Sequence, residues 1–226
     1  MTDNALQPTP NRCALPRRFS DFATFGEALD YAAQGTRGLN FHDPRGTLAK
    51  VYTFAELRED AIAMAQRLIA RGIKPGDRIA LIAETGVDFA ALFCGTIYAG
   101  AWPVPLPLPT SFGGKDNYIE QLSVQLASSD PQMLLFPEEI AEMAGAAAAR
   151  QGCTSVTYED CRAGNAPDCA LPQQNPDDIC YLQYSSGSTR FPHGVAVTHE
   201  ALLNNLAGHS TGMKLEDDDR CVSWLP

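Results

Sequence analysis

Residues 78–104 read RIALIAETGVDFAALFCGTIYAGAWPV, and this stretch decides the fold. Its opening residues, RIALIA, form a nearly continuous apolar run, as expected of a strand that is covered on both faces. Thr85 and Gly86 open a predicted helix that ends at Gly100, and residues 101–104 predict a second short strand. A strand, a helix and a strand in so short a span indicate a βαβ unit within a parallel sheet.

The residues before this unit predict a long helix with well-marked ends. Thr53 followed by Glu56 fits a capping box, in which each side chain accepts a hydrogen bond from the other residue's backbone N–H. An apolar stripe at helical spacing follows, and Gly72 stands where a glycine commonly ends a helix. Further upstream the pattern predicts a short helix over 22–33 and two short strands over 39–41 and 50–52.

Downstream of the βαβ unit the pattern continues to alternate between helix and strand. Residues 104–109 read VPLPLP and are expected to form a stiff, extended crossing segment, because proline favours polyproline-like torsions. Recognition by a proline-binding domain is the alternative explanation of this run. The other predicted elements are helices over 118–127, 137–151 and 199–206, strands over 133–136, 155–158, 179–182, 195–198 and 220–226, and a polar connection over 159–176. Thr198 is the predicted N-cap of the helix over 199–206.

These elements predict an α/β fold, with a parallel or mixed sheet flanked by helices. The chain has 226 residues, which is enough for a sizeable core in one large domain or two small ones. Residues 1–21 are polar and contain prolines, so they are expected to form a loose amino-terminal segment.

Charge and cysteine usage exclude several classes of function. A net charge of −10 argues against nucleic acid or an anionic membrane as the main partner. The sequence shows neither the pattern of a signal peptide nor an apolar run long enough to cross a membrane. The seven cysteines include no C-x-x-C pair, which speaks against a zinc site and for reduced thiols in the cytoplasm.

Residues 179–205, ICYLQYSSGSTRFPHGVAVTHEALLNN, contain the candidate binding loop. Four hydroxyl side chains, two glycines and an arginine fall between two predicted strands. Hydroxyl and backbone N–H donors on a tight turn form a concavity for anions, and a guanidinium adds positive charge. Such clusters also form ordinary turns, and this one lacks the Gly-Lys-Ser/Thr of a Walker loop. The candidate binding residues of this loop are Ser185, Ser186, Gly187, Ser188, Thr189, Arg190 and Gly194.

Four motifs occur in order along the chain: YTFAEL at 52–57, GIKPGDRIAL at 72–81, AGAWPVP at 99–105 and SSGSTRFPHG at 185–194. Together they resemble the motifs of adenylate-forming enzymes, the superfamily of acyl-CoA synthetases, luciferases and peptide-synthetase adenylation domains. The resemblance implies that residues 22–226 are part of the large amino-terminal AMP-binding domain of such an enzyme. The small carboxy-terminal domain of the superfamily has no counterpart in the sequence.

Three further segments, 105–109, 182–184 and 197–205, are similar to those of fatty acyl-AMP ligases. These enzymes use ATP to convert a long-chain fatty acid into its acyl-adenylate with release of pyrophosphate. They then transfer the acyl group to the phosphopantetheine thiol of an acyl carrier protein. An acyl-CoA synthetase and a peptide-synthetase-type adenylation domain are the alternatives on the same scaffold. From another class, the alternative is a protein that binds a nucleotide or a partner without catalysis.

The resemblance implies that the seven loop residues bind the β- and γ-phosphates of ATP, with Mg²⁺ arriving on the nucleotide. Two positions depart from the family: Arg190 replaces its usual glycine, and His193 its usual lysine. The superfamily's adenine-binding strands, magnesium carboxylate and catalytic lysine come later in its sequences, so we expect no catalytic residue in this chain and no complete adenylation by it alone. The histidines, His42, His193, His199 and His209, lack partner spacing and are interpreted as surface or packing residues.

Overall fold

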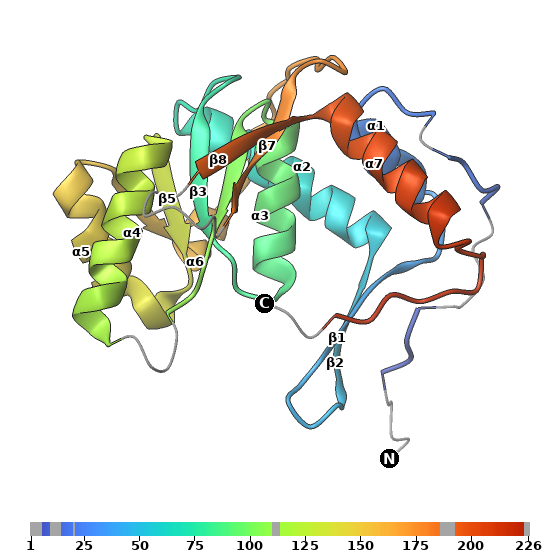
Figure 1. Cartoon of the computed structure of the whole chain (residues 1–226), viewed down its shortest axis with the longest axis horizontal. Helices are drawn as coiled ribbons and strands as arrows, with labels where there is room; N and C mark the ends of the chain where they lie inside the picture. The colour runs from blue at the N-terminus through green and yellow to red at the C-terminus, as the bar shows by residue number, and fades with distance from the viewer. Residues whose placement is uncertain (1–5, 10–14, 20, 110–113, 186–192, 224–226) are drawn as a thin grey trace.

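The computed structural model describes residues 6–9, 15–19, 21–109, 114–185 and 193–223. Within them, the centre of the molecule is a four-stranded parallel sheet with strand order β4-β3-β5-β6 and helices on both faces (Figure 1). Two antiparallel hairpins lie beside it. The strands are β1 Gly38–His42, β2 Leu48–Thr53, β3 Arg78–Ile82, β4 Trp102–Leu106, β5 Met133–Phe136, β6 Thr154–Thr157, β7 Ile179–Ser185 and β8 His193–Thr198.

The helices connect and cover these strands. A parallel sheet needs crossover connections, and the helices α3, α4 and α5 provide them between successive parallel strands (Figure 1). The described helices are α1 Phe25–Ala32, α2 Phe54–Ala70, α3 Val87–Tyr98, α4 Lys115–Ser129, α5 Ala141–Gln151, α6 Tyr158–Arg162 and α7 His199–Gly212, with a 3-10 turn at Glu138–Ile140.

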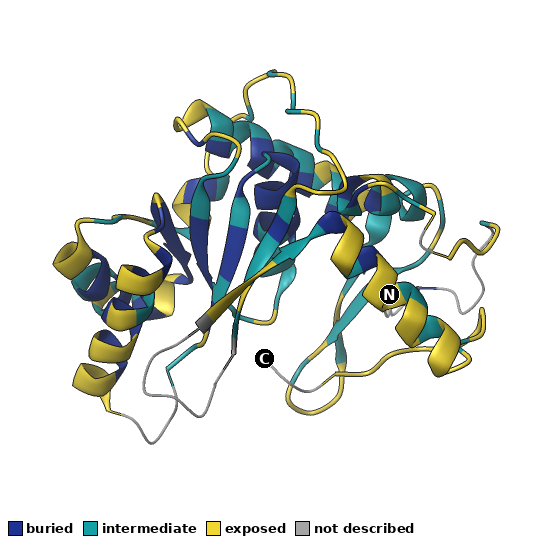
Figure 2. Cartoon of the chain, turned by 45° about the horizontal axis from the view of Figure 1, so that its top comes forward, coloured by how far each residue is buried: buried dark blue, intermediate teal, exposed yellow. Residues whose placement is uncertain are grey.

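Strand β3 is buried on both faces, as the apolar run predicts. Ile79 and Leu81 point into a core that contains side chains of α2, α3 and α6. Ala80 and Ile82 point to the opposite face, into a core built with α4 and α5. Figure 2 shows this buried centre in dark blue and the mostly exposed helix α7 in yellow. The predicted α/β class and the βαβ unit β3–α3–β4 are confirmed.

The capping box at the start of α2 is also confirmed. The Glu56 N–H donates to Thr53 Oγ1 at 3.2 Å, and the Thr53 N–H donates to Glu56 Oε2 at 2.7 Å. At the other end Gly72 has a φ of +90°, a left-handed conformation that favours glycine. Both ends of this helix are therefore set by local sequence.

Pro103 lies in β4, within the strand predicted over 101–104. The proline-rich run nevertheless corrects one prediction, because β4 continues through Pro105 to Leu106 where a crossing segment is expected. The Trp102 N–H donates to the Asp77 carbonyl at 2.7 Å, and the Leu106 carbonyl accepts a hydrogen bond from the N–H that directly follows β3. Alternate residues of β4 thus face β3, and the two proline nitrogens face away from it. A residue without an N–H is tolerated on such an outer edge.

Other boundaries differ from the predicted ones. The predicted strand at 220–226 is wrong over its described part, because residues 220–223 form no strand. Thr157 ends β6 and caps α6, so the predicted connection 159–176 begins inside a short helix. Helix α1 starts at Phe25 behind its cap Thr24, and α7 extends to Gly212. In each case capping or packing sets the observed boundary, which hydrophobic periodicity predicts less accurately.

The amino-terminal segment has no helix or strand in its described residues, 6–9, 15–19 and 21. Thr9 is nevertheless buried against strand β1. Its N–H donates to Asn40 Oδ1 and its hydroxyl accepts from Asn40 Nδ2, both at 3.2 Å. In the part of the chain that the structure describes, none of the helices combines the length and the apolar character needed to cross a membrane.

A glycine in α3 tests how tightly the helices pack on β3. A Cβ at Gly95 would lie 2.7 Å from Met64 Cβ and 2.8 Å from the Ala61 carbonyl oxygen, both in α2. We expect Gly95→Ala to lower the free energy of unfolding by about 1–2 kcal/mol, because overpacking outweighs the better helix propensity of alanine.

The matched control is Gly145→Ala in α5, where a methyl group would have no other atom within 4 Å. There alanine should stabilise the protein by up to about 1 kcal/mol. Urea denaturation of both variants measures the difference. Equal stabilisation by the two substitutions would contradict the close approach of α2 and α3.

Candidate functional site

The candidate loop closes the hairpin of β7 and β8. The two strands pair antiparallel, with Tyr184 opposite Gly194 and Ser185 opposite His193 as the last pairs before the loop. Ser185 therefore ends β7 and Gly194 lies in β8. The other predicted binding residues, Ser186, Gly187, Ser188, Thr189 and Arg190, lie outside the described residues.

Gly194 lies directly against the ring of Tyr184. A Cβ at this position would be 3.3 Å from Tyr184 Cζ and 3.5 Å from its hydroxyl oxygen. This is tighter than ordinary van der Waals contact. The strand therefore has a steric reason for glycine here, one that depends on the neighbouring strand and that the loop motif alone does not reveal.

Side chains attach the loop end of the hairpin to the rest of the molecule. Leu182 and Tyr184 pack against the apolar core under α4. The Tyr184 hydroxyl donates a hydrogen bond to Ser128 Oγ, in the last turn of α4, at 3.0 Å. Sequence reasoning did not identify this contact, since neither residue carries a recognisable motif.

The opposite end of the hairpin is held by buried groups. Cys180 is fully buried at an irregularity in the β7–β8 register, and Tyr181 lies 6.0 Å from Phe93 between ring centroids. Thr198 ends β8 and caps α7, accepting a hydrogen bond from the Ala201 N–H at 3.1 Å. This confirms Thr198 as the predicted cap. Burial raises the pKa of the Cys180 thiol to about 12, so this cysteine stays protonated at neutral pH.

His199, the first residue of α7, links this helix to α1. It is 1% exposed, and its Nδ1 accepts a hydrogen bond from the Phe25 N–H at 3.1 Å. Burial lowers the pKa of His199, while nearby Asp178 opposes that shift. A neutral, buried, hydrogen-bonded imidazole fits the predicted packing role.

An open depression of about 440 Å³ lies beside the loop end of the hairpin, lined among others by Arg78, Ser129 and Asp130. The Arg78 guanidinium donates to the Asp130 carboxylate at 2.7 Å and to the carbonyls of Ser129 and Asp130. Its charge is therefore neutralised by Asp130. This arginine ties β3 to the end of α4.

The carboxyl ends of the parallel strands are where open α/β sheets usually bind ligands. Here that edge carries Glu84, just after β3. Burial, followed by the charges of Glu139 and Asp88, raises the pKa of the Glu84 carboxyl. A polyphosphate at this edge would meet the negative charges of Glu84 and Glu139, while Asp88 is paired with Arg162. The hairpin loop therefore remains the candidate site for an anion.

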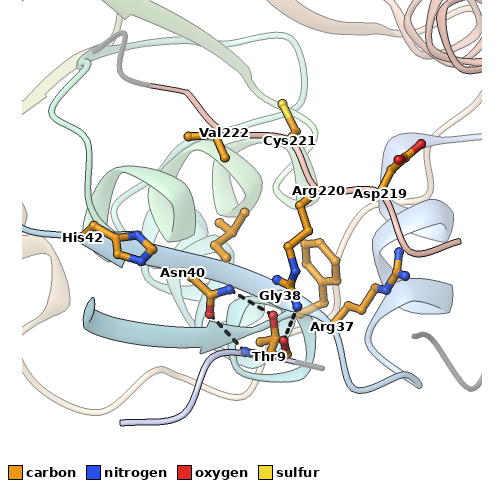
Figure 3. A pocket seen from close by; sticks show the side chains of 11 residues that line it. Thr9, Arg37, Gly38, Asn40, His42, Asp219, Arg220, Cys221 and Val222 are labelled. Carbon is orange, nitrogen blue, oxygen red and sulfur yellow. Dashed lines mark hydrogen bonds between the residues drawn. The ribbon is translucent and has the colours of Figure 1, made fainter. Parts of the chain in front are cut away.

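A second cavity, of about 360 Å³, lies between β1, the amino-terminal segment and residues 219–222 (Figure 3). Arg220 donates a hydrogen bond to the Thr9 carbonyl, and Asn40 bonds the same threonine. These polar groups hold three chain segments together that are distant in the sequence. No group of three or more metal-ligating side chains occurs among the described residues, and the six cysteines described there are free.

The chain matches the family described as "AMP-binding enzyme" over residues 39–226. It is 42% identical over 224 residues to a protein of Caulobacter vibrioides named "Putative acyl-CoA synthetase", covering 98% of this chain and 39% of that protein. It is 32% identical to the long-chain-fatty-acid–AMP ligase FadD32 of Mycolicibacterium smegmatis, over 89% of this chain and 31% of the ligase.

Solved structures give the same picture. The chain is similar to a structure from a study of fatty acyl-adenylate ligases of E. coli and L. pneumophila, with a TM-score of 0.89 and 41% identity over 93% of this chain and 38% of that one. An L. pneumophila fatty acyl-adenylate ligase in complex with acyl adenylate and pyrophosphate shares the fold, with a TM-score of 0.76 and 24% identity. The chain thus spans under two-fifths of the length of these proteins.

The buried imidazole of His199 predicts a pH dependence of folding. Its pKa is lowered in the folded state, so between the folded value and the ordinary value of about 6.5 the unfolded chain binds the proton that the folded chain lacks. This contribution to stability is complete above about pH 6.5 and is lost as the pH falls, at no more than about 1.4 kcal/mol per pH unit.

The variant His199→Asn retains an acceptor for the Phe25 N–H but does not titrate, so it should show a smaller loss of stability between about pH 7 and pH 5. The control is His209→Asn, exposed on the same helix. Urea denaturation at several pH values measures the slopes. An unchanged slope in His199→Asn together with a reduced one in His209→Asn would contradict the assignment.

Proposed function

Because this chain belongs to the AMP-binding enzyme family, we propose that it supplies the phosphate-binding part of a fatty acyl-AMP ligase. The reaction is ATP-dependent activation of a long-chain fatty acid. The observation that carries the proposal is the β7–β8 hairpin, which brings Ser185 and Gly194 to the two ends of one short, hydroxyl-rich connection. The fatty acyl-adenylate ligase structure at 41% identity supports the choice of substrate class.

In this reaction a carboxylate oxygen of the fatty acid attacks the α-phosphorus of ATP. The bond from that phosphorus to the bridging oxygen breaks, and pyrophosphate leaves with the electron pair. The task of the protein is to hold the β- and γ-phosphates and to align the leaving group with the attacking oxygen. We assign this task to the hydroxyls of Ser185, Ser186, Ser188 and Thr189, the backbone at Gly187 and Gly194, and the charge of Arg190.

Magnesium fits this scheme as a companion of the nucleotide. Mg²⁺ keeps several waters and is commonly bound through substrate phosphates and one or two carboxylates. In this proposal the hairpin loop meets the ion through the phosphates that it binds. When bound, the ion would neutralise charge on the phosphates.

We propose an acyl carrier protein as acceptor, whose phosphopantetheine thiol attacks the acyl-adenylate carbonyl and releases AMP. The name of the FadD32 relative, a long-chain-fatty-acid–AMP ligase, supports a product at the adenylate stage. Coenzyme A is the second candidate acceptor, because the relative at 42% identity carries an acyl-CoA synthetase name. We also propose that the enzyme works in the cytoplasm, which the cysteine pattern supports.

Pyrophosphate binding by the chain itself tests the assignment of the loop. Loss of one hydroxyl that donates to a charged phosphate should weaken binding by about 1.5–3 kcal/mol. We therefore expect Ser188→Ala to bind pyrophosphate about 10- to 100-fold more weakly than wild type in isothermal titration calorimetry. The matched control is Ser155→Ala, on an exposed position of β6, which should bind as wild type does.

Exchange of labelled pyrophosphate into ATP tests the reaction class. In a longer protein that contains this chain, exchange should depend on a long-chain fatty acid and should fall with Ser188→Ala. Adding either coenzyme A or a holo acyl carrier protein then identifies the acceptor from the thioester formed. Exchange stimulated by amino acids but by no fatty acid would refute the proposed substrate class.

A further inference from the structure

We propose that Tyr184 is a positioning residue for the phosphate-binding loop, acting through Ser128. The proposal rests on the function assigned above to the hairpin loop. Tyr184 lies one residue before Ser185, on the strand that enters the loop, and its ring faces Gly194 on the strand that leaves it. Its hydroxyl reaches the last turn of α4, where it donates to Ser128 Oγ at 3.0 Å.

The hairpin needs such an attachment because its strands are not part of the central sheet. In the described residues β7 and β8 form a separate two-stranded sheet, although β7 runs beside β4 (Figure 1). Pro103 and Pro105 remove two N–H donors from the β4 edge that does not pair with β3. A two-stranded hairpin is only marginally stable in isolation. Side-chain contacts must therefore fix where its loop end lies.

The anchor Ser128 lies at a helix end that is itself tied to the central sheet. Helix α4 ends one residue later, and Asp130 stops it in a left-handed conformation with a φ of +44°. The Asp130 carboxylate pairs with Arg78 at 2.7 Å. Arg78 begins β3, the strand that is buried on both faces. A continuous path thus leads from the central sheet through Arg78, Asp130 and Ser128 to Tyr184.

Gly194 completes the arrangement by leaving room for the ring. A methyl group there would approach Tyr184 Cζ to 3.3 Å and would press on the ring that carries the hydroxyl. The Tyr184 side chain is therefore confined between the opposite strand and the end of α4. Confinement of this kind fixes the direction of the chain at the end of β7, and a segment that is fixed before binding loses less entropy when a ligand binds.

The variant Tyr184→Phe tests the role of the hydroxyl, since it keeps the ring packing. We expect pyrophosphate binding to weaken about 3-fold, because one neutral, partly solvated hydrogen bond is lost. Ser128→Ala should have the same effect, and the double variant should be no worse than either single one. Ser128→Thr keeps a hydroxyl and should restore binding. The control is Tyr31→Phe, which removes another hydroxyl bond, to the Pro16 carbonyl at 2.7 Å.

Amide hydrogen exchange of residues 193–198 supplies a readout that does not depend on a ligand. Exchange should accelerate in Tyr184→Phe and Ser128→Ala while the melting temperature and the exchange of β3 stay as in wild type. Tyr31→Phe should leave both pyrophosphate binding and the amide exchange of residues 193–198 unchanged.

The outcomes separate this proposal from the proposed function. If wild type binds no pyrophosphate but Tyr184→Phe and Ser128→Ala accelerate amide exchange in β8, the attachment of the hairpin through Tyr184 and Ser128 stands and the proposed function fails. If wild type binds pyrophosphate and both variants bind equally well with unchanged exchange, the positioning role is refuted and the loop assignment stands. The positioning role would also be refuted if Tyr31→Phe weakened pyrophosphate binding as much as Tyr184→Phe does.

Discussion

The structure depends on the burial of β3 from both sides. A five-residue strand, Arg78–Ile82, contributes Ile79 and Leu81 to one core and Ala80 and Ile82 to the other. Helices must cover both faces for this burial to be complete, and parallel pairing with β4 and β5 places their connections there. Close packing on one face even requires Gly95 of α3, which lies against the backbone of α2.

The hairpin of β7 and β8 is attached to this core by different means. Its backbone hydrogen bonds are internal, so its place on the molecule is set by side chains at both ends. At one end His199 accepts a bond from the first residue of α1, and at the other Tyr184 reaches α4. The two strands that lead into the loop are therefore attached to the rest of the molecule at both ends of the hairpin.

Charge distribution supports the choice of the hairpin loop for the phosphates. The carboxyl edge of the sheet carries Glu84 and Glu139, and its third carboxylate, Asp88, is paired with Arg162. At the other place, Arg78 is paired with Asp130. Neither place suits a polyphosphate. The loop motif offers hydroxyls and an arginine in a chain with a net charge of −10, so the attraction of an anion to this protein has to be local. Membership of the AMP-binding family agrees with that assignment.

Sequence alone determined the α/β class, the βαβ unit, both ends of α2 and the Thr198 cap, because these depend on neighbouring residues. It also determined the family, through motifs in order. The tertiary structure alone decided that β4 continues through Pro105, that residues 220–223 form no strand, and that Tyr184 meets Ser128. The reason is physical: partners 56 residues apart, or 174 for Phe25 and His199, meet only once whole elements have packed, and no local period encodes that.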